Sequence, residues 1–379
     1  MITYLDCAAT TPIDPRITGL VMHFITEEFG NPGSRTHDMG RTARRAIERA
    51  RDQVAAAAGA TRGEIFFTSG ATESNNLAIL GLSEYGLRTG RKHLVSTQIE
   101  HHAVLEPLQL LRTRGFELTL LPPNRGGWVE PDAVRSAVRD DTLLVSVIHV
   151  NNETGVVQPV EEVAAVLRDR SAYLHVDAAQ SFGKFLQPLR DPRIDLISIS
   201  GHKVHAPKGV GALVARRRGA ERPPIQPLMY GGGQELGLRP GTLPVHLVAA
   251  LGLASELAAT EAPQRTDACR RFRDRMLAAL APLNPVLAGD QRRVAPHIVN
   301  LSFPGLDSDD VISALAEYVA ISSGAACTSQ TYTCSHVLGS MGLDGPQLTG
   351  ALRFSWCHLT KDVDWAPVVA AVRRLRAGS

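Results

Sequence analysis

Short apolar runs alternate with stretches of helical periodicity between residues 64 and 215, and this alternation limits the fold more than any other feature of the sequence. Residues 65–67, 143–150 and 196–199 are apolar runs of strand length, bounded by turn residues. Strands that alternate with helices predict a mostly parallel sheet with helices on both faces. In open sheets of this type, ligands bind beyond the carboxyl ends of the strands.

Polar side chains gather at that edge of the predicted sheet. They follow the ends of successive strands, and they are Thr72, His101, Asn152, Asp177, Gln180, Ser200, His202 and Lys203. This convergence is more specific than any single motif, and it predicts a ligand site.

Lys203 is one of only five lysines in a chain whose positive charge is carried mainly by arginine. Lysine is almost never fully buried without a partner, and unlike arginine it can form a Schiff base. A lysine at the end of a buried strand therefore favours a chemical role. The alternative is a strand-end lysine that points to solvent.

Three other groups at this edge allow two interpretations each. Asp177 directly follows a buried strand, so its carboxylate should face a cation or a protonated nitrogen, unless it is a helix N-cap. The turn at residues 69–73 leads either into a helix whose start binds phosphate or into an ordinary capped helix. The pair His101 and His102 lacks a third ligand at metal spacing, which argues against a metal site.

The length of 379 residues is sufficient for two domains. We expect a large domain at residues 15–258 and a smaller α+β domain made of residues 1–14 and 259–379. Residues 261–264, which include Pro263, should interrupt the helical pattern at the boundary.

Composition narrows the class of protein. A net charge of +2 gives no reason to expect direct binding of nucleic acid or a membrane surface. The apolar runs are too short to span a bilayer, and nothing near Met1 resembles a signal peptide. The five cysteines contain no C-x-x-C pair, which argues against a disulfide framework or structural zinc and fits a reducing cytoplasm.

A second reactive candidate lies in residues 322–334, which are small, polar and poor in apolar anchors. Such a loop tends to carry function, so Cys327 is a candidate nucleophile, whereas Cys334 fits a helix-packing residue. Arg353, on a predicted strand, has a guanidinium fork suited to a carboxylate, or it is a surface charge. The other cysteines are expected to be small core residues: Cys7, Cys269 and Cys357.

Nine motifs together closely resemble the pyridoxal-phosphate-dependent cysteine desulfurases, in the branch with the longer cysteine loop, within the class V aminotransferase superfamily. In chain order they are YLDCAATTP, GNPGSRTHDMGR, FTSGATESNN, EHHAVL, VNNETGVVQ, HVDAAQSFGK, SGHKVHAPKGVGAL, GGGQELGLRPGTLPVH and SSGAACTS. The resemblance implies a fold-type-I α/β homodimer. Such an enzyme removes sulfur from L-cysteine, giving L-alanine and an enzyme-bound persulfide.

The resemblance also implies roles for the reactive groups. Lys203 would bind the aldehyde of pyridoxal 5'-phosphate and shuttle a proton, and Cys327 would accept the sulfur. His101 would stack on the cofactor ring, while Asp177 would keep the pyridinium nitrogen protonated so that the ring acts as an electron sink.

Further residues match contacts to cofactor and substrate. Asn152 would contact the substrate carboxylate side and Gln180 the pyridoxal hydroxyl. Arg353 would clamp the substrate carboxylate, with Asn31 nearby. The phosphate contacts implied are Ala71, Thr72, Ser200, His202 and, lent by the other subunit, Thr242.

The chain departs from the family pattern without losing a catalytic group. Cys7 stands where Asn or Ser is usual, Gly201 and Ala325 stand where Ala and Ser are common, and residues 204–206 read Val-His-Ala instead of apolar-Tyr-Gly. His205 lies close enough in sequence to Lys203 to perturb it.

The resemblance implies a sulfur-acceptor protein as partner, either an iron–sulfur scaffold or an enzyme that thiolates tRNA or DNA. An aminotransferase or a selenocysteine-preferring lyase, in which Cys327 would be incidental, is one alternative. A non-catalytic platform protein with this fold is another.

Overall fold

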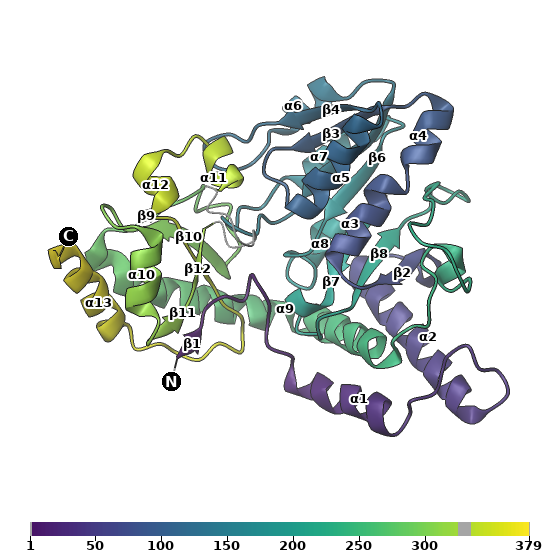
Figure 1. The fold of residues 1–379 in the computed structure, drawn as a ribbon, viewed down its shortest axis with the longest axis horizontal. Coiled ribbons are helices and arrows are strands. Elements are labelled where there is room, and N and C mark those ends of the chain that lie inside the picture. The colour runs from purple at the N-terminus through teal and green to yellow at the C-terminus, as the bar shows by residue number, and fades with distance from the viewer. Residues whose placement is uncertain (1, 325–334, 379) are drawn as a thin grey trace.

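A computed structural model describes residues 2–324 and 335–378 (Figure 1). A seven-stranded sheet forms the centre of the larger part of the molecule. Strand β8 is antiparallel to both of its neighbours, and the other pairs are parallel. The mostly parallel α/β fold predicted from the sequence is therefore confirmed. In sheet order the strands are β2 (Ile65–Thr68), β8 (Gly211–Ala215), β7 (Leu196–Ser200), β6 (Tyr173–Asp177), β5 (Thr142–Ile148), β3 (His93–Thr97) and β4 (Glu117–Leu121).

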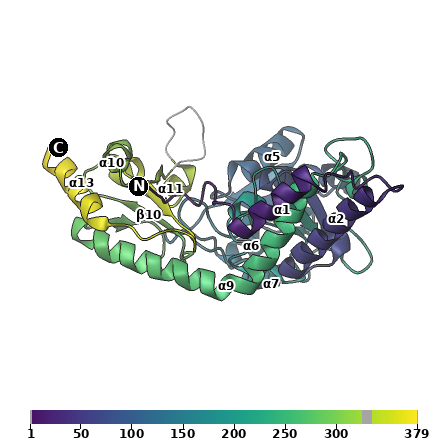
Figure 2. The ribbon, with the colours of Figure 1, turned by 90° about the horizontal axis from the view of Figure 1, so that it is seen from below.

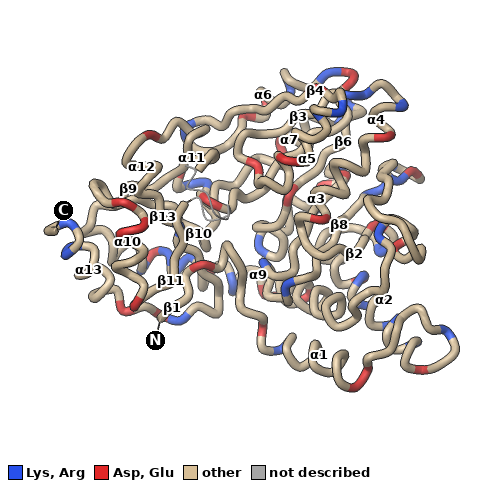
Figure 3. The backbone as a smooth tube through the Cα atoms, viewed as in Figure 1, with Lys and Arg blue, Asp and Glu red and all other residues tan. Residues whose placement is uncertain are grey.

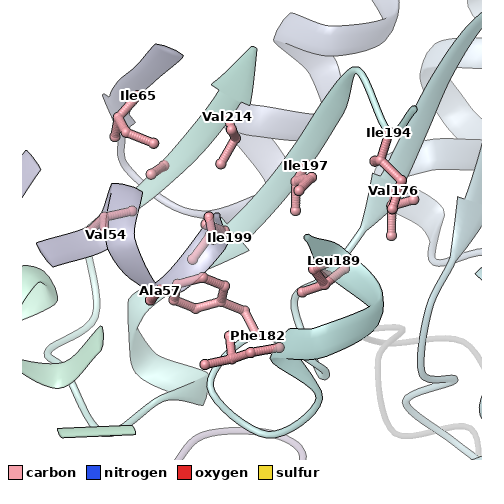
Figure 4. Close-up of a cluster of buried hydrophobic side chains, with 14 of the residues drawn as sticks. Val54, Ala57, Ile65, Val176, Phe182, Leu189, Ile194, Ile197, Ile199 and Val214 are labelled. Carbon is pink, nitrogen blue, oxygen red and sulfur yellow. The ribbon is translucent and has the colours of Figure 1, made fainter. Parts of the chain in front are cut away.

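Helices cover both faces of this sheet because alternate side chains of each buried strand point to opposite faces. Ile65 and Phe67 of β2 join one apolar cluster, and Phe66 between them joins another. Figure 4 shows the first cluster, in which Val54 and Ala57 face Ile197 and Ile199 of β7. The helices of the larger part before α9 are α1 (Pro15–Thr26), α2 (Asp38–Ala58), α3 (Ala71–Leu80), α4 (Ser83–Thr89), α5 (His102–Thr113), α6 (Pro131–Ala137), α7 (Val160–Val166) and α8 (Leu186–Leu189).

The smaller part of the molecule contains a four-stranded antiparallel sheet. Its strands in order are β12 (Ser322–Ser323), β13 (Leu352–Ser355), β10 (Ile298–Ser302) and β9 (Val286–Leu287). The N-terminal strand β1 (Thr3–Tyr4) joins this part by pairing with β11 (Val319–Ala320). Its helices are α10 (Ser308–Leu315), α11 (His336–Ser340), α12 (Gly345–Thr349) and α13 (Trp365–Gly378).

One long helix, α9 (Val245–Leu280), joins the two parts (Figure 2). The expected interruption at residues 261–264 is wrong, because the helix continues through Pro263. A proline inside a helix removes one backbone hydrogen bond, and ion pairs hold the helix there. Glu261 binds Arg265 one turn later at 2.9 Å and also binds Arg16 of α1.

The apolar composition of α9 follows from packing. By length and composition, residues 245–283 are long and apolar enough to cross a membrane. The short apolar runs of the sequence did not predict this. Half of the apolar window is buried inside the protein, where α9 packs against α1 and α2. The helix therefore fits a core helix.

Gly252 of α9 allows the close approach of α2, and this makes a testable site. A Cβ at position 252 would lie 2.5 Å from the Cα atom of Ala50. Gly252→Ala should therefore lower the free energy of unfolding by about 1–3 kcal/mol through overpacking, measured as the urea midpoint. Gly19→Ala in α1 is the control, because a Cβ added at position 19 would have no neighbouring atom within 4 Å. The control should gain about 0.5–1 kcal/mol, and equal effects of the two substitutions would contradict the packing argument.

Candidate active site

A cavity of about 370 Å³ opens where β6 and β7 end and α3 begins. It is the edge of the sheet at which the sequence predicts a ligand site. Nine of the ten residues predicted to contact the cofactor line this cavity, and they are Ala71, Thr72, His101, Asn152, Asp177, Gln180, Ser200, His202 and Lys203.

Lys203 reaches the cavity from a single 3₁₀ turn, Gly201–Lys203, that follows β7 directly. Gly201 makes this turn fit, since a Cβ there would lie 2.9 Å from the carbonyl oxygen of Val210. The Lys203 Nζ atom donates hydrogen bonds to the carbonyl oxygens of Ala8 and, at 2.9 Å, Ala9. The catalytic candidate therefore faces the cavity and the N-terminal segment, and the solvent-facing alternative is wrong.

Lys184, which the sequence analysis did not identify, contacts the same 3₁₀ turn through its side chain. Its Nζ atom donates to the carbonyl oxygens of Lys203 at 3.0 Å and Gln180 at 3.1 Å. Burial lowers the pKa of Lys184 to about 8. The Gln180 side chain also donates to the Ala8 carbonyl at 2.8 Å, so one carbonyl joins two predicted site residues.

Asp177 is buried and accepts two hydrogen bonds. Asn75 Nδ2 donates to Oδ2 at 2.8 Å, and the backbone N–H of Ala179 donates to Oδ1 at 2.9 Å. The second bond closes a turn after β6 and caps no helix, because the next helix, α8, begins at Leu186. The N-cap alternative is therefore wrong, and the carboxylate lines the cavity. Asn75 was missed, although it lies four residues after Ala71, on the same face of a helix.

The histidines at the site differ in role. His101 is the N-cap of α5, where its Nδ1 atom accepts a hydrogen bond from Ala103 at 3.0 Å. His102 contacts the ring of His336, with ring centroids 4.9 Å apart, and does not line the cavity. Burial and then the charge of Lys203 lower the pKa of His202 to about 4, so His202 is neutral at physiological pH.

His205 does not line this cavity among the described residues. Its φ of +71° is unusual for a non-glycine residue. The conformation is held by the Thr11 hydroxyl, which accepts from the His205 N–H at 3.0 Å, and by ring contact with His358. Burial lowers the pKa of His205 to about 3, so the residue places no charge beside Lys203.

Three predicted residues lie apart from the cavity within the described part of the chain. Thr242 and Asn31 line a different cavity of about 420 Å³. Arg353 is fully buried, so the surface-charge alternative is wrong. It donates to Asp6 at 2.8 Å and to the Asn152 carbonyl at 3.2 Å.

The cysteines divide into two groups. Cys7, Cys269 and Cys357 are buried, as the sequence predicts. Cys327, Cys334 and Ala325 lie outside the described residues.

Comparisons with known proteins find similar proteins over nearly the whole chain. The family model for aminotransferase class V matches residues 3–364. Cysteine desulfurase IscS of Pectobacterium carotovorum is 42% identical over 374 residues, which cover 98% of this chain and 92% of the relative. The solved structure of DndA from Streptomyces lividans has a TM-score of 0.82 at 50% identity, covering 94% of this chain and 99% of that chain. A structure of SspA in complex with cysteine has a TM-score of 0.83 at 34% identity, covering 95% and 100%.

The chain therefore belongs to the class V aminotransferase family. Members of this family carry out amino-acid chemistry with pyridoxal phosphate. Within it, the chain is a pyridoxal-phosphate-dependent cysteine desulfurase, as its motifs predict.

The cavity has the groups that pyridoxal phosphate requires. An amine that can bind an aldehyde, a buried carboxylate and an imidazole ring line the same space. The start of a ten-residue helix, α3, offers backbone N–H groups for a phosphate. Gln180 Oε1 is buried without a hydrogen-bond partner among the described residues, so the cavity still holds an acceptor for a ligand hydroxyl.

Glu100, next to His101, gives a pH-dependent prediction. Oε1 accepts from Thr97 at 2.6 Å and from the Ile148 N–H at 2.9 Å, while Oε2 is buried without a partner in the described residues. Burial raises the pKa of Glu100 from 4.5 to about 8. The stability contributed by the neutral form is complete below the unfolded pKa of 4.5, and it is lost as the pH rises to about 8.

Glu100→Gln should therefore be as stable as the parent near pH 4.5 and more stable at pH 9. The gain should be on the order of 5 kcal/mol, because each pKa unit between 4.5 and about 8 is worth about 1.4 kcal/mol and glutamine, which mimics the neutral acid, cannot ionise. Urea unfolding at pH 5, 7 and 9 measures it. The exposed Glu84→Gln variant is the control and should show no such trend, and a Glu100→Gln difference independent of pH would refute the assignment.

Proposed function

We propose that Lys203 binds the aldehyde of pyridoxal 5'-phosphate and moves the α-proton of L-cysteine. The observation that carries this assignment is that the Lys203 amine, the Asp177 carboxylate and the His101 ring line one cavity. Bound there, pyridoxal phosphate supplies an electron sink that weakens the bonds around the substrate α-carbon. Asp177 keeps a proton on the ring nitrogen, and His101 packs its ring against that of the cofactor.

The phosphate group is proposed to bind at the start of α3. Ala71 and Thr72 begin this helix, whose N-terminal N–H groups favour an anion. Ser200 and His202 come from the end of β7 and the following turn, on the same cavity wall. A neutral His202 can donate a hydrogen bond to a phosphate oxygen through one ring nitrogen.

Arg353 and Asn152 are proposed to hold the substrate carboxylate. Arg353 already contacts the Asn152 backbone, and its buried Nε atom has no hydrogen-bond partner among the described residues. An unpaired buried guanidinium donor is costly, so a carboxylate ligand would satisfy it. The relative crystallised with cysteine supports an amino-acid substrate of this size.

Cys327 is proposed to take the sulfur as a persulfide. Its thiolate attacks the substrate sulfur, the carbon–sulfur bond breaks, and L-alanine is left after protonation. The residue lies outside the described structure, and the SSGAACTS motif supports the assignment.

Two substitutions separate the roles of Lys203 and Cys327. Lys203→Ala should lose the visible absorbance of bound pyridoxal phosphate, and alanine formation should fall by a factor on the order of 10³. Cys327→Ala should keep that absorbance but form neither sulfide nor alanine from L-cysteine. Cys269→Ala, a buried cysteine apart from this chemistry, should keep both. Unchanged desulfuration by Cys327→Ala would instead favour an aminotransferase or a selenocysteine-preferring lyase.

A homodimer is proposed to complete the site. Thr242 follows a loop with several exposed apolar side chains, Tyr230 at 85% exposure and Leu236 at 69%. Thr242 and Asn31 share a cavity separate from that of Lys203. We therefore place both residues on the surface that faces the partner subunit, with Thr242 reaching the partner's phosphate.

Complementation between subunits tests this proposal. A heterodimer of a Lys203→Ala chain and a Thr242→Ala chain contains one intact site if Thr242 acts on the partner. It should show about half the alanine formation of the parent dimer, while each homodimer is defective. If Thr242 acted within its own chain, both sites of the heterodimer would be defective.

The sulfur acceptor is proposed to be a protein in the cytoplasm, either an iron–sulfur scaffold or an enzyme that thiolates tRNA or DNA. Basic and acidic residues are interspersed along the backbone (Figure 3), in agreement with the net charge of +2. Such a distribution favours a protein partner over direct binding of a nucleic acid.

A further inference from the structure

Three buried thiols and one lysine meet behind the catalytic turn. Cys7, Cys269 and Cys357 line a small cavity of about 40 Å³ together with Lys184. They come from the N-terminal segment, from α9 and from the segment after β13. The chemistry proposed above uses none of these thiols.

Cys7 and Cys357 lie on chain segments that run side by side. Ser355 joins the two segments, because its carbonyl accepts from the Cys7 N–H at 3.1 Å and its N–H donates to Leu5 at 2.8 Å. Asp6 and Ser355 form a parallel bridge. In this parallel register Cys7 lies beside Trp356, and Cys357 is the next residue, so the two cysteines are diagonal neighbours on adjacent segments. Neighbouring strands lie about 5 Å apart, and a disulfide spans Cα atoms about 4.4–6.8 Å apart.

The two thiols also interact directly. A hydrogen bond from the Cys7 thiol lowers the pKa of Cys357 to about 7, and the same contact raises that of Cys7. The Thr360 hydroxyl adds a contact to the Cys357 sulfur at 3.7 Å. We assign Cys357 as the nucleophile of the pair because its sulfur also accepts the Thr360 hydroxyl contact, whereas burial raises the pKa of Cys269 to about 12 and leaves it inert.

A second cavity gives access to this pair. It has a volume of about 530 Å³ and is lined by the N-terminal segment and residues 359–362. Of the described cysteines, only Cys7 and Cys357 line it. The pair therefore lies between the two cavities. No group of three or more His, Cys, Asp or Glu residues within the described part of the chain could hold a metal ion.

We propose that Cys7 and Cys357 form a redox-active dithiol that a small organic disulfide oxidises. The Cys357 thiolate attacks one sulfur of the reagent, forming a mixed disulfide and releasing one thiolate. Cys7 then attacks the Cys357 sulfur, and the second reagent thiol leaves with the Cys7 proton. Two electrons pass from the protein thiols to the reagent, which is reduced to two thiols.

The dithiol is coupled to the catalytic lysine through the backbone. Cys7 directly precedes Ala8 and Ala9, whose carbonyls hold the Lys203 Nζ atom. Closing a disulfide at Cys7 moves this acceptor pair. This coupling depends on the role proposed for Lys203. The formation of the disulfide does not depend on that role.

The test uses the full chain with Cys327→Ser and Cys334→Ser, so that only the three described thiols remain. The protein is incubated with glutathione disulfide at pH 8, alkylated, and digested without reductant for mass spectrometry. The expected product is a cross-link between the Cys7 and Cys357 peptides that dithiothreitol reverses. Recovery of both thiols alkylated, or cross-links that involve Cys269 to the same extent, would overturn the proposal.

Single variants give the order of attack. Cys7→Ser should stop at a glutathione adduct on Cys357, and Cys357→Ser should leave Cys7 at least ten-fold slower to react. Cys269→Ser is the matched control and should keep the cross-link. The visible absorbance of bound pyridoxal phosphate should shift on oxidation and return on reduction. If the disulfide formed and the absorbance did not change, the coupling to Lys203 would be refuted, but the dithiol itself would not.

Discussion

The site depends on the hydrogen bonds that hold the Lys203 amine against the carbonyls of Ala8 and Ala9. A lysine inside a protein must find polar partners, and here these partners are backbone groups of a distant segment. The Ala8 carbonyl also accepts from Gln180, and Lys184 binds the carbonyl of Lys203 itself. The N-terminal segment therefore holds the amine of Lys203 and also pairs with β11 in the smaller part of the molecule.

Two features fix the relation between the larger and smaller parts of the molecule. Helix α9 passes through both without interruption, held at its middle by the Glu261 ion pairs. Strand β13 brings Arg353 against the Asn152 carbonyl at the edge of the larger sheet. A substrate between these groups would contact both parts at once.

Most of the cavity could be predicted from the sequence, because parallel strands place their carboxyl ends at one edge. Local pattern could not find Lys184, whose importance arises from a contact with a residue 19 positions away. For Asn75, the helix face shared with Ala71 was a signal, but its contact with Asp177, 102 positions away, was not predictable locally. Thr242 shows another limit, because the phosphate that it is proposed to contact lies in the partner subunit. The interruption expected at Pro263 was wrong: α9 continues through the proline, where packing against α1 and α2 and the pairing of Glu261 with Arg16 hold the helix in place. The adjacency of Cys7 and Cys357 is equally non-local.

The pairing of the N-terminal segment with Ser355 has a consequence for biosynthesis. The Ala8 N–H donates to a hydroxyl 347 positions later in the chain, at 2.8 Å. During translation at about 5–20 residues per second, this segment waits on the order of half a minute for that hydroxyl. Until then the backbone carbonyls that receive Lys203 lack the strand that fixes them. The nascent enzyme therefore acquires its lysine pocket only when the last strand has emerged.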